Sequence, residues 1–121
     1  IGSAGTAAQQ VKAGRVRALA VTTKMRSAGA PDLPTMQEAG VAGYEVAGWY
    51  GVLAPAKTPR PIIDKLNTEI VRILHSTDIQ SKLAADGSEP VGNTPEQFHA
   101  HIKAEVAKWA KVVRDANIRA E

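Results

Sequence analysis

The hydrophobic positions along this chain follow a helical period in two long stretches. The first stretch begins after Thr58-Pro59, an N-cap residue followed by a proline suited to the first helical turn, and it ends near His75. Its apolar positions are Ile62, Leu66, Ile70 and Ile73. The second stretch begins at a capping box of Thr94 and Gln97 and is expected to run past Asp115. Its apolar face consists of Phe98, Ile102, Val106, Trp109, Val113 and Ala116.

Shorter helices are indicated where helix-forming residues end at a glycine. Residues 6–14 end at Gly14, and residues from about 78 to 86 are stopped by Gly87. Glycine suits the left-handed conformation that follows many helices, so both segments are predicted to be helical. Thr35 and Glu38 form another capping box, which predicts a helix of one or two turns.

Other apolar segments lack a helical period and predict strands. Residues 15–23 are almost continuously apolar at their centre, as expected for a strand covered on both faces of a parallel sheet. Residues 44–54 are rich in aromatic and β-branched residues but contain two glycines, which predicts a bent strand. Residues 88–91 predict a short strand. After Pro55 the chain changes from strand-bearing to mostly helical, which marks a candidate boundary between lobes.

Composition narrows the class of protein. The chain has 121 residues, of which 44% are hydrophobic and 22% charged, and no apolar run is long enough to cross a bilayer. The absence of cysteine excludes disulfides and thiolate chemistry. A net charge of +3 raises the question of nucleic acid, but the cations are mostly dispersed among acids and lack stacking aromatics. No nucleic-acid partner is therefore expected. The chain starts at Ile1, so any targeting peptide is expected to have been removed or to lie outside it.

Catalytic and metal-binding patterns are missing from the sequence. His99 and His101 are two residues apart and point in different directions around a helix, unlike the spacing that converges on zinc. The glycine pairs do not complete a dinucleotide or phosphate-loop motif. The sequence therefore predicts no catalytic residue, no metal and no cofactor.

Two features have a possible binding role. Gly2 and Gly5 would let the backbone approach a ligand, and Ser3 and Thr6 offer hydroxyl groups where a helix begins and its free N–H groups attract anions. The alternative is an ordinary N-cap turn. Trp49 lies beside glycines and could form the floor of a cleft, or it could be a core residue with one polar tip.

A series of motifs, in order along almost the whole chain, resembles a known family. The segments are Val11 to Thr22, Pro31 to Thr35 with Glu38-Ala39-Gly40, Gly48 to Gly51, Ala54-Pro55, Pro61 to Asn67, Gly87 to Gly92, and Thr94 to Trp109. Together they closely resemble the C-terminal part of the Bug-type solute-binding receptors of tripartite tricarboxylate transporters. The resemblance is specific because many motifs occur in the right order.

The resemblance implies an α/β fold, the C-terminal portion of a two-lobed, type II-like periplasmic binding protein with parallel strands, flanking helices and a long C-terminal helix. Residues 1–47 would complete the second lobe, and residues 48–121 would supply the crossing strand and the C-terminal part of the first. The family implies a non-enzymatic periplasmic receptor that captures a small carboxylate and delivers it to membrane components. Many relatives have an acid where this chain has Gly2-Ser3, which is more compatible with a ligand lacking an amine. Gly2, Ser3, Thr6 and Trp49 are the expected ligand-binding residues.

Two other classes remain open at the level of sequence. One is a small α/β hydrolase-like enzyme that uses Ser3 or Thr6 near a histidine, although no base stands in a recognisable relation to either hydroxyl. The other is a structural interaction domain. The apolar stripe from Phe98 to Val113 is too large to leave in water, so the isolated chain is expected to form a homodimer unless the remainder of the receptor accompanies it.

Overall fold

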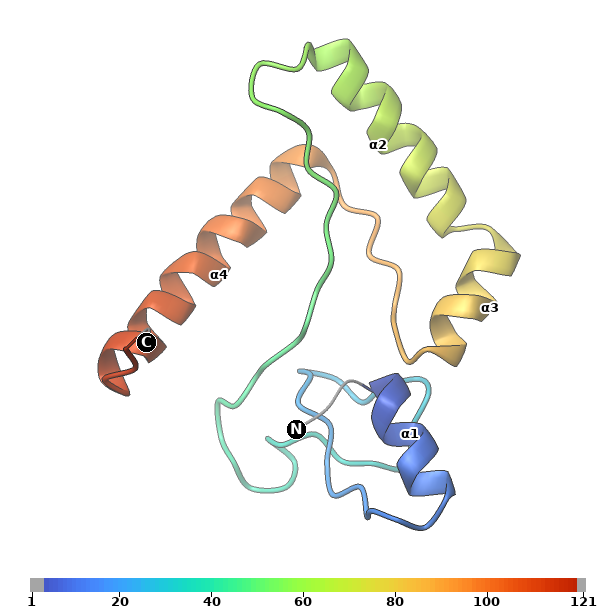
Figure 1. Ribbon diagram of the computed structural model, residues 1–121, viewed down its shortest axis with the longest axis vertical. Coiled ribbons are helices and arrows are strands. Elements are labelled where there is room, and N and C mark those ends of the chain that lie inside the picture. The colour runs from blue at the N-terminus through green and yellow to red at the C-terminus, as the bar shows by residue number, and fades with distance from the viewer. Residues whose placement is uncertain (1–3, 120–121) are drawn as a thin grey trace. The chain divides into compact units, whose positions relative to one another are not determined.

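The computed structural model describes residues 4–119, and helices account for nearly all the regular structure in this range. In chain order they are α1 (Ala4–Lys12), α2 (Arg60–Leu74), α3 (Thr77–Ala85) and α4 (Pro95–Asp115) (Figure 1). All four were predicted from sequence, with bounds that differ by a few residues. The fifth expected helix, after Thr35, is a single turn that ends at Gly40.

Local hydrogen bonds explain why α4 begins where it does. The Gln97 N–H donates to Thr94 Oγ1 at 3.2 Å, and the Thr94 N–H donates to Gln97 Oε1 at 2.9 Å. This reciprocal pair satisfies two backbone donors that have no partner inside the helix. The predicted capping box is therefore confirmed.

A left-handed residue follows three of the helices. Gly14 follows α1 with a φ of 67°, and the Arg15 N–H reaches back to the Gln10 carbonyl at 3.0 Å. Gly87 follows α3 with a φ of 71°, and Asn117 occupies the corresponding position after α4 with a φ of 50°. Glycine and asparagine tolerate this conformation, so they allow the chain to turn while the last carbonyls of each helix find donors.

The expected buried strand at residues 15–23 does not form among the described residues. Its pairing is limited to one isolated parallel bridge, in which Val21 N–H donates to the Pro34 carbonyl at 2.8 Å and Met36 N–H donates to the Val21 carbonyl at 2.9 Å. Leu19 is 72% exposed. A parallel strand is stable when strands flank it and both faces are covered, and the described residues supply neither.

The expected bent strand at residues 44–54 is extended but is not paired into a sheet. Within the described range, the Val46 N–H donates to the Thr22 carbonyl at 2.8 Å, and no ladder continues from that bond. The short strand expected at residues 88–91 is also absent from the described structure. The parallel sheet implied by the resemblance is thus not seen among residues 4–119.

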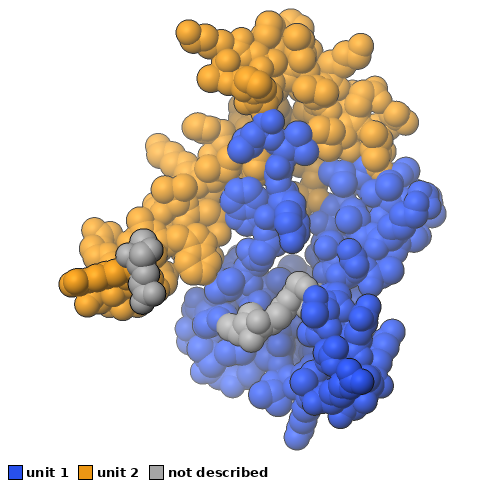
Figure 2. Space-filling model, in the orientation of Figure 1, with its two compact units in different colours: residues 1–53, 74–90 blue, residues 54–73, 91–121 orange. Residues whose placement is uncertain are grey.

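The chain divides into two compact units (Figure 2). Unit 1 contains residues 1–53 and 74–90, and unit 2 contains residues 54–73 and 91–121. This division differs from the predicted lobes at residues 1–47 and 48–121, mainly because α3 joins unit 1. The two compact units are defined by contacts among these 121 residues alone, and the lobes of a complete receptor need not coincide with them. The lobe assignment therefore stays a prediction.

Neither unit has a hydrophobic core of its own among the described residues. No described hydrophobic side chain is buried, and the buried polar residue is Thr35, which is 3% exposed. A folded domain of ordinary stability buries most of its large apolar side chains. No described helix is long and apolar enough to span a membrane.

Candidate functional site

The first candidate site is the start of α1, and the structure describes only part of it. Gly2 and Ser3 lie outside the described residues, so their expected role is neither supported nor opposed by the geometry. Thr6 lies in the first turn of α1 with an exposed side chain. This position agrees with the predicted helix start.

Gly5 has a structural reason to be glycine. A Cβ atom at this position would lie 2.9 Å from the backbone carbonyl oxygen of Asp86, at the end of α3. Real Cβ contacts are essentially never this short, and a backbone oxygen cannot move away as a flexible side chain can. We expected Gly5 to let a ligand approach. In the described structure, the space beside Gly5 is occupied by the backbone of Asp86 at the end of α3.

The carboxylate of Asp86 also lies near this turn, with its Oδ1 atom 3.5 Å from the same Cβ position. A negative charge is favourable next to the positive end of the α1 dipole, whose first turn contains no acidic residue of its own. Asp86 therefore supplies part of the negative charge that the start of α1 attracts.

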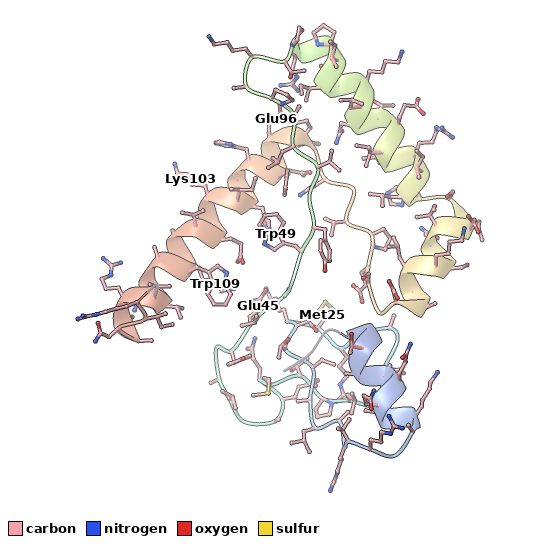
Figure 3. The ribbon with its side chains drawn as sticks, in the orientation of Figure 1. Met25, Glu45, Trp49, Glu96, Lys103 and Trp109 are labelled. Atoms are coloured by element: carbon pink, nitrogen blue, oxygen red, sulfur yellow. The ribbon has the colours of Figure 1, made fainter. Side chains whose placement is uncertain are left out.

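The second candidate, Trp49, lies in the extended segment of unit 1, and Figure 3 shows its ring beside that segment. Its side chain is 43% exposed, so it is not a core residue within this chain. Neither Thr6 nor Trp49 is among the residues that line the two hollows described below. Their expected role in ligand binding stays a prediction.

The larger hollow belongs to unit 1 and has a volume of about 600 Å³. It opens between residues 24–26 and the turn that begins at Thr35. Its lining consists of Lys24, Met25, Arg26, Thr35, Gln37 and Glu38. The hollow is wide and open to solvent, which makes it a weaker ligand cage than the enclosed clefts that surround small molecules.

A closed set of polar contacts holds this turn in place. The Thr35 N–H donates to Glu38 Oε2 at 2.8 Å, and the Glu38 N–H donates to Thr35 Oγ1 at 3.1 Å. The same Oε2 atom accepts a hydrogen bond from Arg26 Nε at 2.9 Å. Arg26 also donates to the Pro31 carbonyl at 3.2 Å. The capping box was predicted from sequence, but its link to Arg26, twelve residues away, depends on how the loop folds.

These contacts favour the ionised form of Glu38. The hydrogen bond from the Thr35 backbone lowers the pKa of Glu38 below its ordinary value of 4.5, and Arg26 lowers it further. The carboxylate therefore stays charged at neutral pH and is already paired. Glu38 is better suited to fix the loop than to exchange protons with a substrate.

The smaller hollow, of about 210 Å³, also lies within unit 1. It is formed by the loop at residues 27–29, one side of α3, and residues 87–90. None of the residues predicted to bind a ligand contributes to it. The sequence contained no signal for this hollow because two segments distant in sequence, residues 27–29 and 80–90, create it.

No metal-binding cluster is found in the described part of the chain. No group of three or more histidine, cysteine, aspartate or glutamate residues among residues 4–119 could hold a metal ion. The acids with shifted pKa values, Glu38, Glu96 and Glu105, are paired with arginine, lysine or tryptophan. Such pairs are typical of surface ion-pair networks.

Comparisons with known proteins agree with a binding protein of the periplasmic type. Structures similar to this chain include the periplasmic binding protein BugD, with 37% sequence identity, a TM-score of 0.80 and coverage of 94% of this chain and 39% of BugD. A second is Rpa4515 of R. palustris with adipate, with 42% identity, a TM-score of 0.81 and coverage of 93% and 38%. A third is MatC from Rhodopseudomonas palustris with bound malate, with 32% identity, a TM-score of 0.72 and coverage of 90% and 38%. The class is that of the extracytoplasmic solute-binding proteins.

The family follows from the sequence match. Residues 1–118 match the TctC family, described as the tripartite tricarboxylate transporter family receptor. The protein BugT of Bordetella pertussis is 36% identical over 111 residues, which cover 92% of this chain and 34% of BugT. The chain belongs to the tripartite tricarboxylate transporter receptor family, whose members are receptors and not enzymes. It spans about a third of the length of this relative.

Proposed function

We propose that this chain is part of a periplasmic receptor that captures a small carboxylate and presents it to the membrane components of a tripartite tricarboxylate transporter. The observation that carries the proposal is the family match over residues 1–118. The adipate in Rpa4515 and the malate in MatC support a dicarboxylate as the class of ligand.

The charge distribution supports an anionic ligand. The first 31 residues contain five cations and no acid, namely Lys12, Arg15, Arg17, Lys24 and Arg26. Among the described residues, the ion pairs include Arg26 but none of the other four. Unpaired cations on one region raise the local concentration of anions and speed their encounter.

Four residues are proposed to contact the ligand: Gly2, Ser3, Thr6 and Trp49. Thr6 offers an exposed hydroxyl group in the first turn of α1, and Trp49 presents an exposed aromatic ring. Gly2-Ser3 carries no acid that could bind an amino group, which favours a plain carboxylate over an amino acid. The carboxylate of Asp86 beside the start of α1 works against an anion bound directly at that turn.

The complete receptor is proposed to contain the structure that this chain alone lacks. Residues 15–23 become a strand of a parallel sheet, residues 1–47 belong to the second lobe and residues 48–121 to the crossing strand and first lobe. When the chain is alone, its exposed apolar surface leads it to associate with a second copy.

Calorimetry on the receptor that contains this chain tests the proposed ligand class. Adipate is the first probe, and 1,6-diaminohexane is a matched control of equal carbon number and opposite charge. We expect saturable binding of adipate or another small carboxylate and none of the diamine. Binding of the diamine in preference to every mono-, di- and tricarboxylate tested would contradict the proposal.

A further inference from the structure

The larger hollow of unit 1 combines an exposed apolar side chain with two cations. Met25 lines this hollow and is 77% exposed. Lys24 and Arg26 flank Met25 in the sequence and line the same hollow. We call these three residues the basic rim, and Figure 3 marks Met25 at its middle.

Hydrogen bonds hold the backbone and one side chain of the basic rim in place. Thr23 Oγ1 donates to the Met25 carbonyl at 2.6 Å. Arg26 Nε donates to Glu38 Oε2 at 2.9 Å, and Glu38 closes the capping box with Thr35, which is buried. A surface that is already ordered loses little conformational entropy when a partner binds. The basic rim is therefore pre-organised for binding.

The basic rim carries more positive charge than its neighbours compensate. Arg26 is compensated, because it forms an ion pair with Glu38. Lys24 is exposed and takes part in none of the ion pairs found among residues 4–119. Residues 1–31 contain no aspartate or glutamate that could lower this charge. A cation in this setting favours a partner that carries carboxylates.

A wide hollow suits a protein surface better than a small solute. Small ligands bind where most of their surface is enclosed, whereas this hollow is open to solvent. Methionine and arginine are both enriched in protein interfaces, and the flexible thioether adapts to different partner side chains. Lysine and arginine are almost never fully buried unless they are paired, so the basic rim is expected to stay at the surface of a longer receptor.

We propose that the basic rim is a surface by which the receptor docks onto a membrane component of its transporter, and that the docking segment of this partner is acidic. A carboxylate of the partner pairs with Lys24, and an apolar side chain of the same segment enters the hollow and packs on Met25. The proposal rests on the proposed function as a transport receptor, but not on the identity of the ligand.

The test measures docking in the absence of any carboxylate ligand. The membrane components of the transporter are placed in lipid nanodiscs, and biolayer interferometry follows binding of the receptor that contains this chain. Lys24→Gln removes the charge of the side chain, and Lys24→Glu reverses it. Lys103→Glu is the matched control, because Lys103 is an exposed lysine of unit 2 that also lacks an ion pair among the described residues.

We expect Lys24→Gln to weaken docking about threefold, as for the loss of one exposed charge pair. Lys24→Glu should weaken docking at least tenfold because it brings like charges together, and Lys103→Glu should dock as the wild type does. Docking of the wild type should weaken as salt is added, and Lys24→Glu should lose much of this dependence.

Three outcomes would overturn the docking proposal. They are equal docking by the wild type and Lys24→Glu, no docking by the wild type, and equal binding to empty nanodiscs of the same lipids. The last outcome would make the lipid surface the partner.

Calorimetry with adipate is carried out separately, so that failure of one proposal can be told from failure of the other. A receptor that docks through the basic rim but binds no carboxylate would count against the proposed ligand class and leave the docking surface intact. A receptor that binds adipate but docks equally well after Lys24→Glu would overturn the docking surface and leave the ligand class intact.

Discussion

At the scale of single residues, Gly5 shows how a backbone contact can dictate residue type. A methyl group at this position would lie 2.9 Å from the Asp86 carbonyl oxygen, so Gly5→Ala must push α1 and the end of α3 apart. We expect a loss of about 1–3 kcal/mol in the free energy of unfolding, as for other overpacked contacts. Urea unfolding followed by circular dichroism measures it.

Gly48→Ala is the matched control, because nothing lies within 4 Å of its Cβ position. This variant should change stability by only a few tenths of a kcal/mol. Equal destabilisation by the two substitutions would show that the contact between Gly5 and Asp86 does not determine the effect.

Lys57 carries local backbone strain. Its φ is 70°, in the turn that Thr58 closes with an N–H bond of 3.2 Å to the Pro55 carbonyl. A side chain costs roughly 1–2 kcal/mol in this conformation, and glycine adopts it freely. Lys57→Gly should therefore raise the free energy of unfolding by about 1 kcal/mol. Part of this gain is offset because glycine increases the conformational entropy of the unfolded chain.

Lys65→Gly provides the comparison, because Lys65 lies inside α2 and glycine there should cost about 1 kcal/mol. Opposite signs for the two lysine-to-glycine substitutions, measured in the same urea titration, would support the assignment. Destabilisation by both would contradict it.

At the scale of elements, the turn from Thr35 to Gly40 depends on an ionised Glu38. Its pKa is lowered in the folded state by the Thr35 backbone and by Arg26, so its contribution to stability is present above the ordinary value of 4.5. This contribution is lost as the pH falls through the lowered pKa. Glu38→Gln should therefore be less stable than the wild-type chain at neutral pH, and the gap should narrow in acid below pH 4.5.

Stability measured by thermal unfolding across this pH range checks the prediction. Glu45→Gln is a suitable control, since it removes the same charge from another exposed glutamate of unit 1. A gap for Glu38→Gln that stays constant from neutral to acid pH would show that the ionised carboxylate is not what stabilises the turn.

At the scale of the whole molecule, Trp49 is the residue through which ligand binding should be visible. Trp49 is proposed to contact the ligand, so binding of adipate to the receptor should change its emission. Trp49→Phe should remove most of the ligand-induced fluorescence change, whereas Trp109→Phe should preserve it. An unaltered change in Trp49→Phe would show that Trp49 does not report on ligand binding.

Most of the helical structure was predictable because its causes are local. The capping box of Thr94 and Gln97, the glycines after α1 and α3 and the helical spacing of apolar residues all act within a few residues of chain. The candidate site was less predictable. Gly2 and Ser3 fall outside the described residues, and neither Thr6 nor Trp49 lines either of the two hollows of unit 1. The hollow at Arg26 and Glu38 arises from a contact across twelve residues.

The sequence by itself determined the four helices, the family and the absence of a recognisable catalytic motif, since each depends on residue order over short distances. Tertiary structure determined whether residues 15–23 form a strand and why residue 5 is a glycine. A strand needs neighbours that accept its hydrogen bonds and cover its faces. Within the described part of the chain, the backbone of Val21 bonds only to Pro34 and Met36. Gly5 is required because α3 ends against it, a contact that no local pattern in the sequence reveals.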